Sequence, residues 1–150
     1  MSSGSDHDHP PFGFSTRLRV DFADTDAGGI VYFGRYGRYV ERAVMDYRRA
    51  AGVPLLGPDG HRFVVRAMDI AFHAPLRFDD EVEVFVRTLR IGTTSHVMDG
   101  RFERIDPDGA LHVADATVVI VGVRSWNDAV PTAMPDDLRG AIERFEASTH

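Results

Sequence analysis

Cysteine is absent from this sequence of 150 residues. Its absence excludes disulfide bonds, zinc sites built on thiolates and a cysteine nucleophile. Long apolar runs are missing as well, since no stretch approaches the roughly 20 residues that a membrane-spanning helix requires. The N-terminus has neither the basic nor the apolar region of a signal peptide. We therefore expect a cytoplasmic protein without an integral membrane segment.

Basic residues are too few to suggest a nucleic-acid partner. The chain has 17 Lys and Arg against 23 Asp and Glu, a formal net charge of −6, whereas phosphate binding needs a concentrated basic surface. The composition, with 43% hydrophobic and 27% charged residues, is typical of globular proteins. We expect a disordered tail over residues 1–13 and a single domain over 14–147.

Residues 21–52 hold the strongest pattern in the chain. After Gly34, apolar residues recur three and four positions apart, which predicts a helix with one packed face. Gly52 and Pro54 predict its end, because glycine adopts the left-handed closing conformation and proline cannot continue a helix. The stripe consists of Tyr36, Tyr39, Val40, Ala43, Val44, Tyr47, Ala50 and Ala51.

Alternating and β-branched segments predict five strands, over residues 14–23, 62–73, 81–91, 94–105 and 111–124. The second has apolar residues on both faces, which predicts a central strand, and so does the β-branched fifth. A short helix is predicted over 136–147, capped by Asp136 or Asp137. One long helix followed by strands with short connections indicates an α+β fold, with an antiparallel sheet and the helix on one face.

The segment between the first strand and the helix is rich in groups that carry chemistry: Asp24-Thr25-Asp26-Ala27-Gly28-Gly29. Its polar side chains could simply cap the turn or the helix. A carboxylate there could instead attack an ester or thioester carbonyl or activate water, with backbone N–H groups at the helix start holding the oxyanion. A metal role is the weakest reading. Spacing does not decide between the first two.

Histidines are scattered along the chain, and we interpret His61, His73, His96 and His112 as surface or packed residues. His7 and His9, beside Asp6 and Asp8, belong to a solvated tail in which nothing fixes a coordination geometry. We expect neither a metal site nor a cofactor.

The motif from Asp24 to Gly29, continued by Ile30-Val31-Tyr32-Phe33, Tyr36, Tyr39 and Glu41-Arg42-Ala43, resembles the signature of hotdog-fold acyl-CoA thioesterases. It is most similar to 4-hydroxybenzoyl-CoA thioesterases and to the acyl-CoA thioesterases associated with the Tol–Pal system. A second block agrees, with Phe63-Val64-Val65-Arg66, Met68, Ala74-Pro75, Arg77 and Asp79-Asp80, and a weaker third is Thr94-Ser95. Together the blocks span residues 17–135.

The resemblance implies a five-stranded antiparallel sheet wrapped around the long helix, and a homodimer or homotetramer with active sites at the dimer interface. It implies hydrolysis of an acyl-CoA, with an aromatic group such as hydroxybenzoyl or a short to medium aliphatic chain. Coenzyme A enters only as part of the substrate. The rival readings are a hotdog acyl-thioester dehydratase or hydratase, which wants a histidine paired with the carboxylate, and a non-catalytic acyl-CoA-binding module.

By the same resemblance, Asp26 is the catalytic carboxylate, as nucleophile or general base, and the backbone N–H of Phe33 polarises the thioester carbonyl. The Tol–Pal-associated group usually has a histidine at the Phe33 position, so the match moves towards the hydroxybenzoyl type. The resemblance also implies three sets of substrate contacts. Tyr32 would line the acyl pocket, Thr94 and Ser95 of a neighbouring subunit would lie near the pantetheine arm, and Arg90 would lie near the phosphates.

Overall fold

The structure, a computed structural model, describes residues 12–55, 62–127 and 130–149. Residues 1–11 of the expected tail lie outside the described residues. The strands are β1 (Ser15–Arg19), β2 (Arg62–Phe72), β3 (Glu81–Ile91), β4 (Ser95–Asp106) and β5 (Gly109–Val123). The helices are α1 (Tyr36–Ala51) and α2 (Asp136–Ser148), and two 3-10 turns, η2 (Phe22–Asp24) and η3 (Phe33–Arg35), precede α1.

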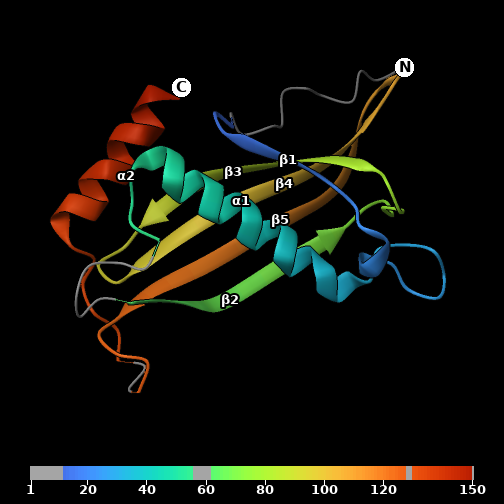
Figure 1. Cartoon of the computed structure of the whole chain (residues 1–150). Coiled ribbons are helices and arrows are strands. Elements are labelled where there is room, and N and C mark those ends of the chain that lie inside the picture. The colour runs from blue at the N-terminus through green and yellow to red at the C-terminus, as the bar shows by residue number, and fades with distance from the viewer. Residues whose placement is uncertain (1–11, 56–61, 128–129, 150) are drawn as a thin grey trace.

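The strands form one antiparallel sheet in the order β1-β3-β4-β5-β2. Helix α1 lies across one face of this sheet, and α2 packs at one end (Figure 1). The predicted α+β fold, with a five-stranded antiparallel sheet and one long helix, is confirmed. The interior position of β5, between β4 and β2, also agrees with the prediction.

The prediction that the second strand is central is wrong, because β2 is an edge strand that, among the described residues, pairs with β5 alone. Its apolar residues on both faces prompted the error. Several of them are exposed in one protomer: Val65 is 58% exposed and Phe72 49%. The apolar pattern correctly predicts a strand. It does not indicate whether that strand has neighbours on both sides in the sheet.

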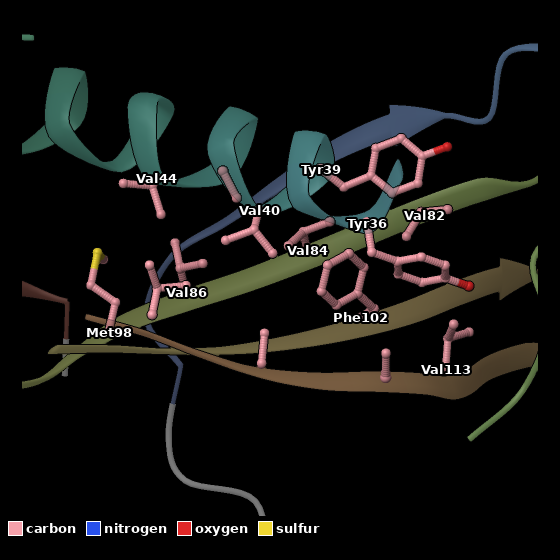
Figure 2. Close-up of a cluster of buried hydrophobic side chains, with 14 of the residues drawn as sticks. Tyr36, Tyr39, Val40, Val44, Val82, Val84, Val86, Met98, Phe102 and Val113 are labelled. Atoms are coloured by element: carbon pink, nitrogen blue, oxygen red, sulfur yellow. The ribbon is translucent and has the colours of Figure 1, made fainter. Parts of the chain in front are cut away.

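Helix α1 is held by the stripe that the sequence predicts, except that Ala50 is exposed. Its buried side chains point at the sheet and meet Val82, Val84 and Val86 of β3 and Phe102 of β4 (Figure 2). The helix ends at Gly52, whose φ of 75° is the left-handed conformation expected of a closing glycine. Within the described ranges, no helix is long and apolar enough to cross a membrane.

Most predicted element ends lie within two residues of those in the structure, but the end of β1 and the cap at the start of α2 differ in ways that have a physical reason. Strand β1 stops at Arg19, because the chain turns into η2 to begin the loop that leads to α1. Helix α2 begins after Pro135, and neither Asp136 nor Asp137 caps it, since both lie inside its first turn. Their negative charges still suit the helix N-terminus, where the backbone dipole is positive.

Candidate active site

The loop before α1 is anchored by the first aspartate of the motif, Asp24, whose side chain is 2% exposed. Its Oδ2 accepts a hydrogen bond of 2.8 Å from the Tyr39 hydroxyl on α1 and one of 3.3 Å from the Asp21 N–H. Arg38 on α1 adds an ion pair of 3.4 Å to Oδ1. Burial first, and the Asp24 carboxylate second, raise the pKa of Tyr39. Asp24 therefore fixes the loop to the helix.

The second aspartate, Asp26, has the opposite surroundings and is exposed. Its Oδ1 accepts a hydrogen bond of 2.8 Å from the Gly28 N–H, and its backbone N–H donates to the Ile30 carbonyl at 2.9 Å. Gly29 has a φ of 82°, a conformation that glycine adopts without strain. Asp26 thus does cap a turn, as one reading of the sequence held, but the turn holds its carboxylate at the surface.

Asp26 and Phe33 line the same cleft, which has a volume of about 350 Å³. Phe33 is the first residue of η3, which leads directly into α1, so its N–H has no acceptor within the helical segment. The remaining walls are Ile30, Val31, Tyr36, Phe72, His73, Ala74 and Pro75. The cleft combines a carboxylate, a helix-start N–H and apolar walls, a set that suits reaction at a carbonyl.

Tyr32 is not among the residues that line this cleft. Its ring packs on the ring of Phe33, with centroids 4.5 Å apart. It also covers Gly34, where an added Cβ would lie 2.7 Å from the Tyr32 ring, so a side chain at that position would collide with it. In one protomer, Tyr32 therefore supports the entry to η3 from outside the cleft.

Arg90, Thr94 and Ser95 lie at the other end of the sheet. They flank the β3–β4 connection, which is tied to the α2 region by the hydrogen bonds from Met134 N–H to Thr93 O and from Arg139 to Gly92 O. Figure 1 shows this connection near α2, whereas the loop before α1 lies at the opposite end. Strand β3 alone spans about 30 Å between the two. A single chain does not bring these residues to Asp26.

His73 is the residue that sequence reasoning missed, because it lines the cleft together with Asp26. Its Nε2 donates to Asp115 Oδ2 at 2.9 Å, and the Nε2 of His112 donates to Asp115 Oδ1 at 2.9 Å. Burial by itself raises the pKa of Asp115, but these two hydrogen bonds and the nearby imidazoles outweigh it and lower the pKa. The three residues could also hold a metal ion. Positions 73 and 112 are too far apart in sequence for spacing to reveal the pair.

His96, by contrast, is a packed residue, as predicted. It is 1% exposed, and its Nε2 is 2.8 Å from the Thr88 hydroxyl. That hydroxyl also meets the Tyr47 hydroxyl, which donates to Glu146 of α2 at 2.8 Å. Burial, with a smaller effect of Arg48, lowers the pKa of His96 to about 3. His96 is therefore neutral and joins β4 to α1 and α2.

A second cleft of about 330 Å³ lies between α1 and β2 and contains none of the predicted site residues. Its walls are mostly apolar, with Glu41 as the single carboxylate among the described residues that line it. Arg48 also lines it, with its guanidinium carbon 4.2 Å from the centroid of the Phe63 ring. Burial lowers the pKa of Arg48 to about 10. Unlike the Asp26 cleft, this cleft does not combine a carboxylate with the first residue of a helical segment among its described lining residues.

Known proteins resemble this chain over most of its length. The family model of the thioesterase-like superfamily matches residues 20–142. The acyl-CoA thioester hydrolase YbgC of Escherichia coli O6:H1 is 34% identical over 127 residues, 83% of this chain and 92% of that protein. The acyl-CoA thioesterase YbgC of Haemophilus influenzae is 29% identical over 137 residues, 89% and 97% of the two chains.

Solved structures agree on the fold. A variant of a 4-hydroxybenzoyl-CoA thioesterase, in complex with 4-hydroxybenzoyl-CoA, matches with a TM-score of 0.78 and 19% identity. The match covers 86% of this chain and 97% of that one. The likeness confirms the hotdog fold that the sequence motif implies.

Proposed function

This chain belongs to the thioesterase-like superfamily, and we propose that it hydrolyses an acyl-CoA thioester to a free acid and coenzyme A. The observation that carries the proposal is that Asp26 and Phe33, the first residue of η3, line one cleft. The relatives of similar length, which are named as acyl-CoA thioester hydrolases, support the substrate class. No cofactor is needed, because hydrolysis requires only the thioester, water, an acid–base group and oxyanion donors.

The proposed mechanism uses Asp26 in one of two ways. As a general base, it takes a proton from water while the water oxygen attacks the thioester carbonyl carbon. As a nucleophile, it attacks that carbon itself to give an acyl-enzyme anhydride, which water then hydrolyses. On either route the C–S bond breaks and coenzyme A leaves as a thiolate that takes up a proton. The Phe33 N–H stabilises the oxyanion, a contact worth about 3–4 kcal/mol for a well-placed donor.

We propose that the working unit is a homodimer or a homotetramer, in which one chain completes the site of another. Arg90, Thr94 and Ser95 lie about 30 Å from the Asp26 end of the same chain, so a neighbouring chain must supply them if they bind coenzyme A. The outer edge of β2 over residues 65–72 pairs with no strand among the described residues and carries the exposed side chains of Val65 and Phe72. This edge supports such pairing, because a second β2 edge would satisfy its backbone groups. Tyr32, exposed beside Phe33, would then reach the acyl group.

The acyl group is proposed to be aromatic, such as hydroxybenzoyl, or a short to medium aliphatic chain. The cleft supports both, because Tyr36 and Phe72 offer ring faces and Ile30 and Val31 offer aliphatic surface. We propose the cytoplasm as the compartment, since a chain without cysteine needs no oxidising environment to fold.

One observation favours a second candidate, an acyl-thioester hydratase or dehydratase. His73 lines the cleft with Asp26 and so provides the histidine that this chemistry requires. The two reactions differ in product: hydrolysis releases a free thiol, whereas hydration leaves the thioester intact and changes the absorbance of an enoyl-CoA. A binding module would release nothing.

The test measures coenzyme A thiol release from aryl-CoA and aliphatic acyl-CoA substrates by wild type, Asp26→Asn and Asp108→Asn. Asp108 is an exposed aspartate in the β4–β5 turn and serves as the matched control. We expect Asp26→Asn to lose about 10²–10⁴-fold in kcat/KM with an unchanged melting temperature, and Asp108→Asn to retain full activity. Full activity of Asp26→Asn, or enoyl-CoA hydration without thiol release, would overturn the proposal.

A further inference from the structure

Two histidines and one aspartate meet at the outer surface where β2 ends against β5. His73 follows the last residue of β2, and His112 and Asp115 lie on β5. One ligand atom from each of the three lies within 4.8 Å of the other two. We infer that His73, His112 and Asp115 form a binding site for a divalent transition-metal ion such as Zn²⁺ or Co²⁺.

A bulge in β5 puts His112 and Asp115 on the same face. Residues three apart in a regular strand point to opposite faces. Val113 is the extra residue, because the register of β5 against β4 shifts between the pairs Glu103–His112 and Phe102–Ala114. Val113 and Ala114 are consequently both buried, while His112 and Asp115 stay outside. The bulge therefore reverses the alternation and brings an imidazole beside a carboxylate.

The same bulge holds His73 in place. The N–H groups of His73 and Ala74 both donate to the Val113 carbonyl, at 2.7 and 3.2 Å. The ring of His73 packs beside that of His112, with centroids 4.6 Å apart. All three side chains thus start from backbone that is hydrogen-bonded within the sheet, which reduces the ordering that an ion would have to impose.

The donor set determines which ions fit. Two imidazole nitrogens and a carboxylate suit Zn²⁺, Co²⁺ or Ni²⁺, whereas Mg²⁺ and Ca²⁺ prefer oxygen ligands alone. In a tetrahedral site with bonds of about 2.0–2.1 Å, neighbouring ligand atoms lie about 3.4 Å apart. Each Nε2 lies 2.9 Å from an Asp115 oxygen, so small side-chain rotations would admit an ion between them once each imidazole carries its proton on Nδ1 instead of Nε2. Water would complete the coordination.

The site is accessible to an ion from solvent. The side chains of His73 and Asp115 are 44% and 48% exposed, so an ion can reach them from solvent. Because His73 also lines the Asp26 cleft, a bound ion would sit at the rim of the candidate active site. The site is nevertheless independent of the proposed hydrolysis, since ion binding is measured without substrate.

The tail residues His7 and His9 are rival ligands, so the test uses the full chain with His7→Ala and His9→Ala as its background. After removal of metals with a chelator, ZnCl₂ is titrated by calorimetry, and CoCl₂ by its visible absorption. We expect one ion per chain in this background and no binding of MgCl₂. Adding Asp115→Asn or His112→Ala should weaken Zn²⁺ binding at least about tenfold. Mutating residues that merely hydrogen-bond to metal ligands already lowers metal affinity by about that factor.

Two results would overturn the inference. One is binding by the wild type that disappears entirely in the tail background, which would assign the ion to His7 and His9. The other is Zn²⁺ affinity in the Asp115→Asn protein equal to that of its background, which would leave the cluster as hydrogen bonds alone. Asp115→Asn decides the case if His112→Ala fails to fold, because asparagine keeps the shape of the side chain, and circular dichroism checks folding for each variant.

Discussion

The two ends of helix α1 both bury polar groups, but they do so for different purposes. At the N-terminal end, buried Asp24 binds Tyr39 and fixes a loop that leaves Asp26 exposed in a cleft. At the C-terminal end, the hydroxyls of Tyr47 and Thr88 join neutral His96 to α2. The comparison shows that a polar network alone does not mark a reaction site. The N-terminal end differs because its network fixes the loop while leaving the Asp26 carboxylate exposed.

Replacement of Asp24 should give the largest change in stability. In Asp24→Ala, the Tyr39 hydroxyl and the Asp21 N–H lose their acceptor inside the protein, so we expect the unfolding free energy to fall by about 3 kcal/mol. Asp26→Ala, two positions away, removes one exposed hydrogen bond and should cost about 1 kcal/mol at most. Urea unfolding of both variants measures the difference. Equal losses would contradict the division of roles between the two aspartates.

The C-terminal network should respond to acid. Burial lowers the pKa of His96 to about 3 in the folded protein, whereas it is about 6.5 in an unfolded chain. Below pH 6.5 the unfolded state binds a proton that the folded state does not, so the unfolding free energy falls with decreasing pH, by up to about 1.4 kcal/mol per pH unit. Between pH 6.5 and 5 the loss should reach about 1.6 kcal/mol.

Urea unfolding of wild type and His96→Gln at several pH values isolates this contribution. Glutamine can hydrogen-bond to Thr88 but does not titrate, so the variant should lose less stability on acidification than the wild type. Parallel pH profiles for the two proteins would show that His96 is not the group responsible.

Substitution of Gly52, at the C-terminal end of α1, should give the smallest change in stability. Gly52 has a φ of 75° and open space around its Cα, so Gly52→Ala should cost about 1 kcal/mol through backbone strain alone. Gly140, inside α2, faces only the flexible end of Arg144, and Gly140→Ala should raise stability by about 0.5 kcal/mol. Thermal unfolding compares the two alanines, and shifts of the same sign would contradict this account.

Much of the fold could be predicted because its patterns are local. The stripe of α1 and the glycine that ends it depend on residues within a few positions of one another. The location of β2 could not be predicted, because Val65 and Phe72 indicate an apolar strand without indicating which neighbour covers it. The short extent of β1 was also missed, since the turn at Phe22 depends on the contact of Asp24 with Tyr39.

The candidate site was predictable to the extent that it lies in one continuous segment. Asp26 and Phe33 are seven residues apart, and their motif already indicated a shared role. His73 and His112 were read as isolated residues, because their meeting depends on the pairing of β2 with β5 and on the extra residue Val113. A change of one residue in strand register reverses which face a side chain occupies, and periodicity alone does not reveal it.

The pairing of β2 has a consequence for how the chain is made. Its partner β5 begins at Gly109, after β3 and β4 have been synthesised. An apolar strand thus leaves the ribosome well before its own neighbour exists, and both of its edges stay open during that interval. Slow synthesis of the segment between the two strands would lengthen the exposure and favour aggregation. Expression yield should therefore depend on translation speed across β3 and β4.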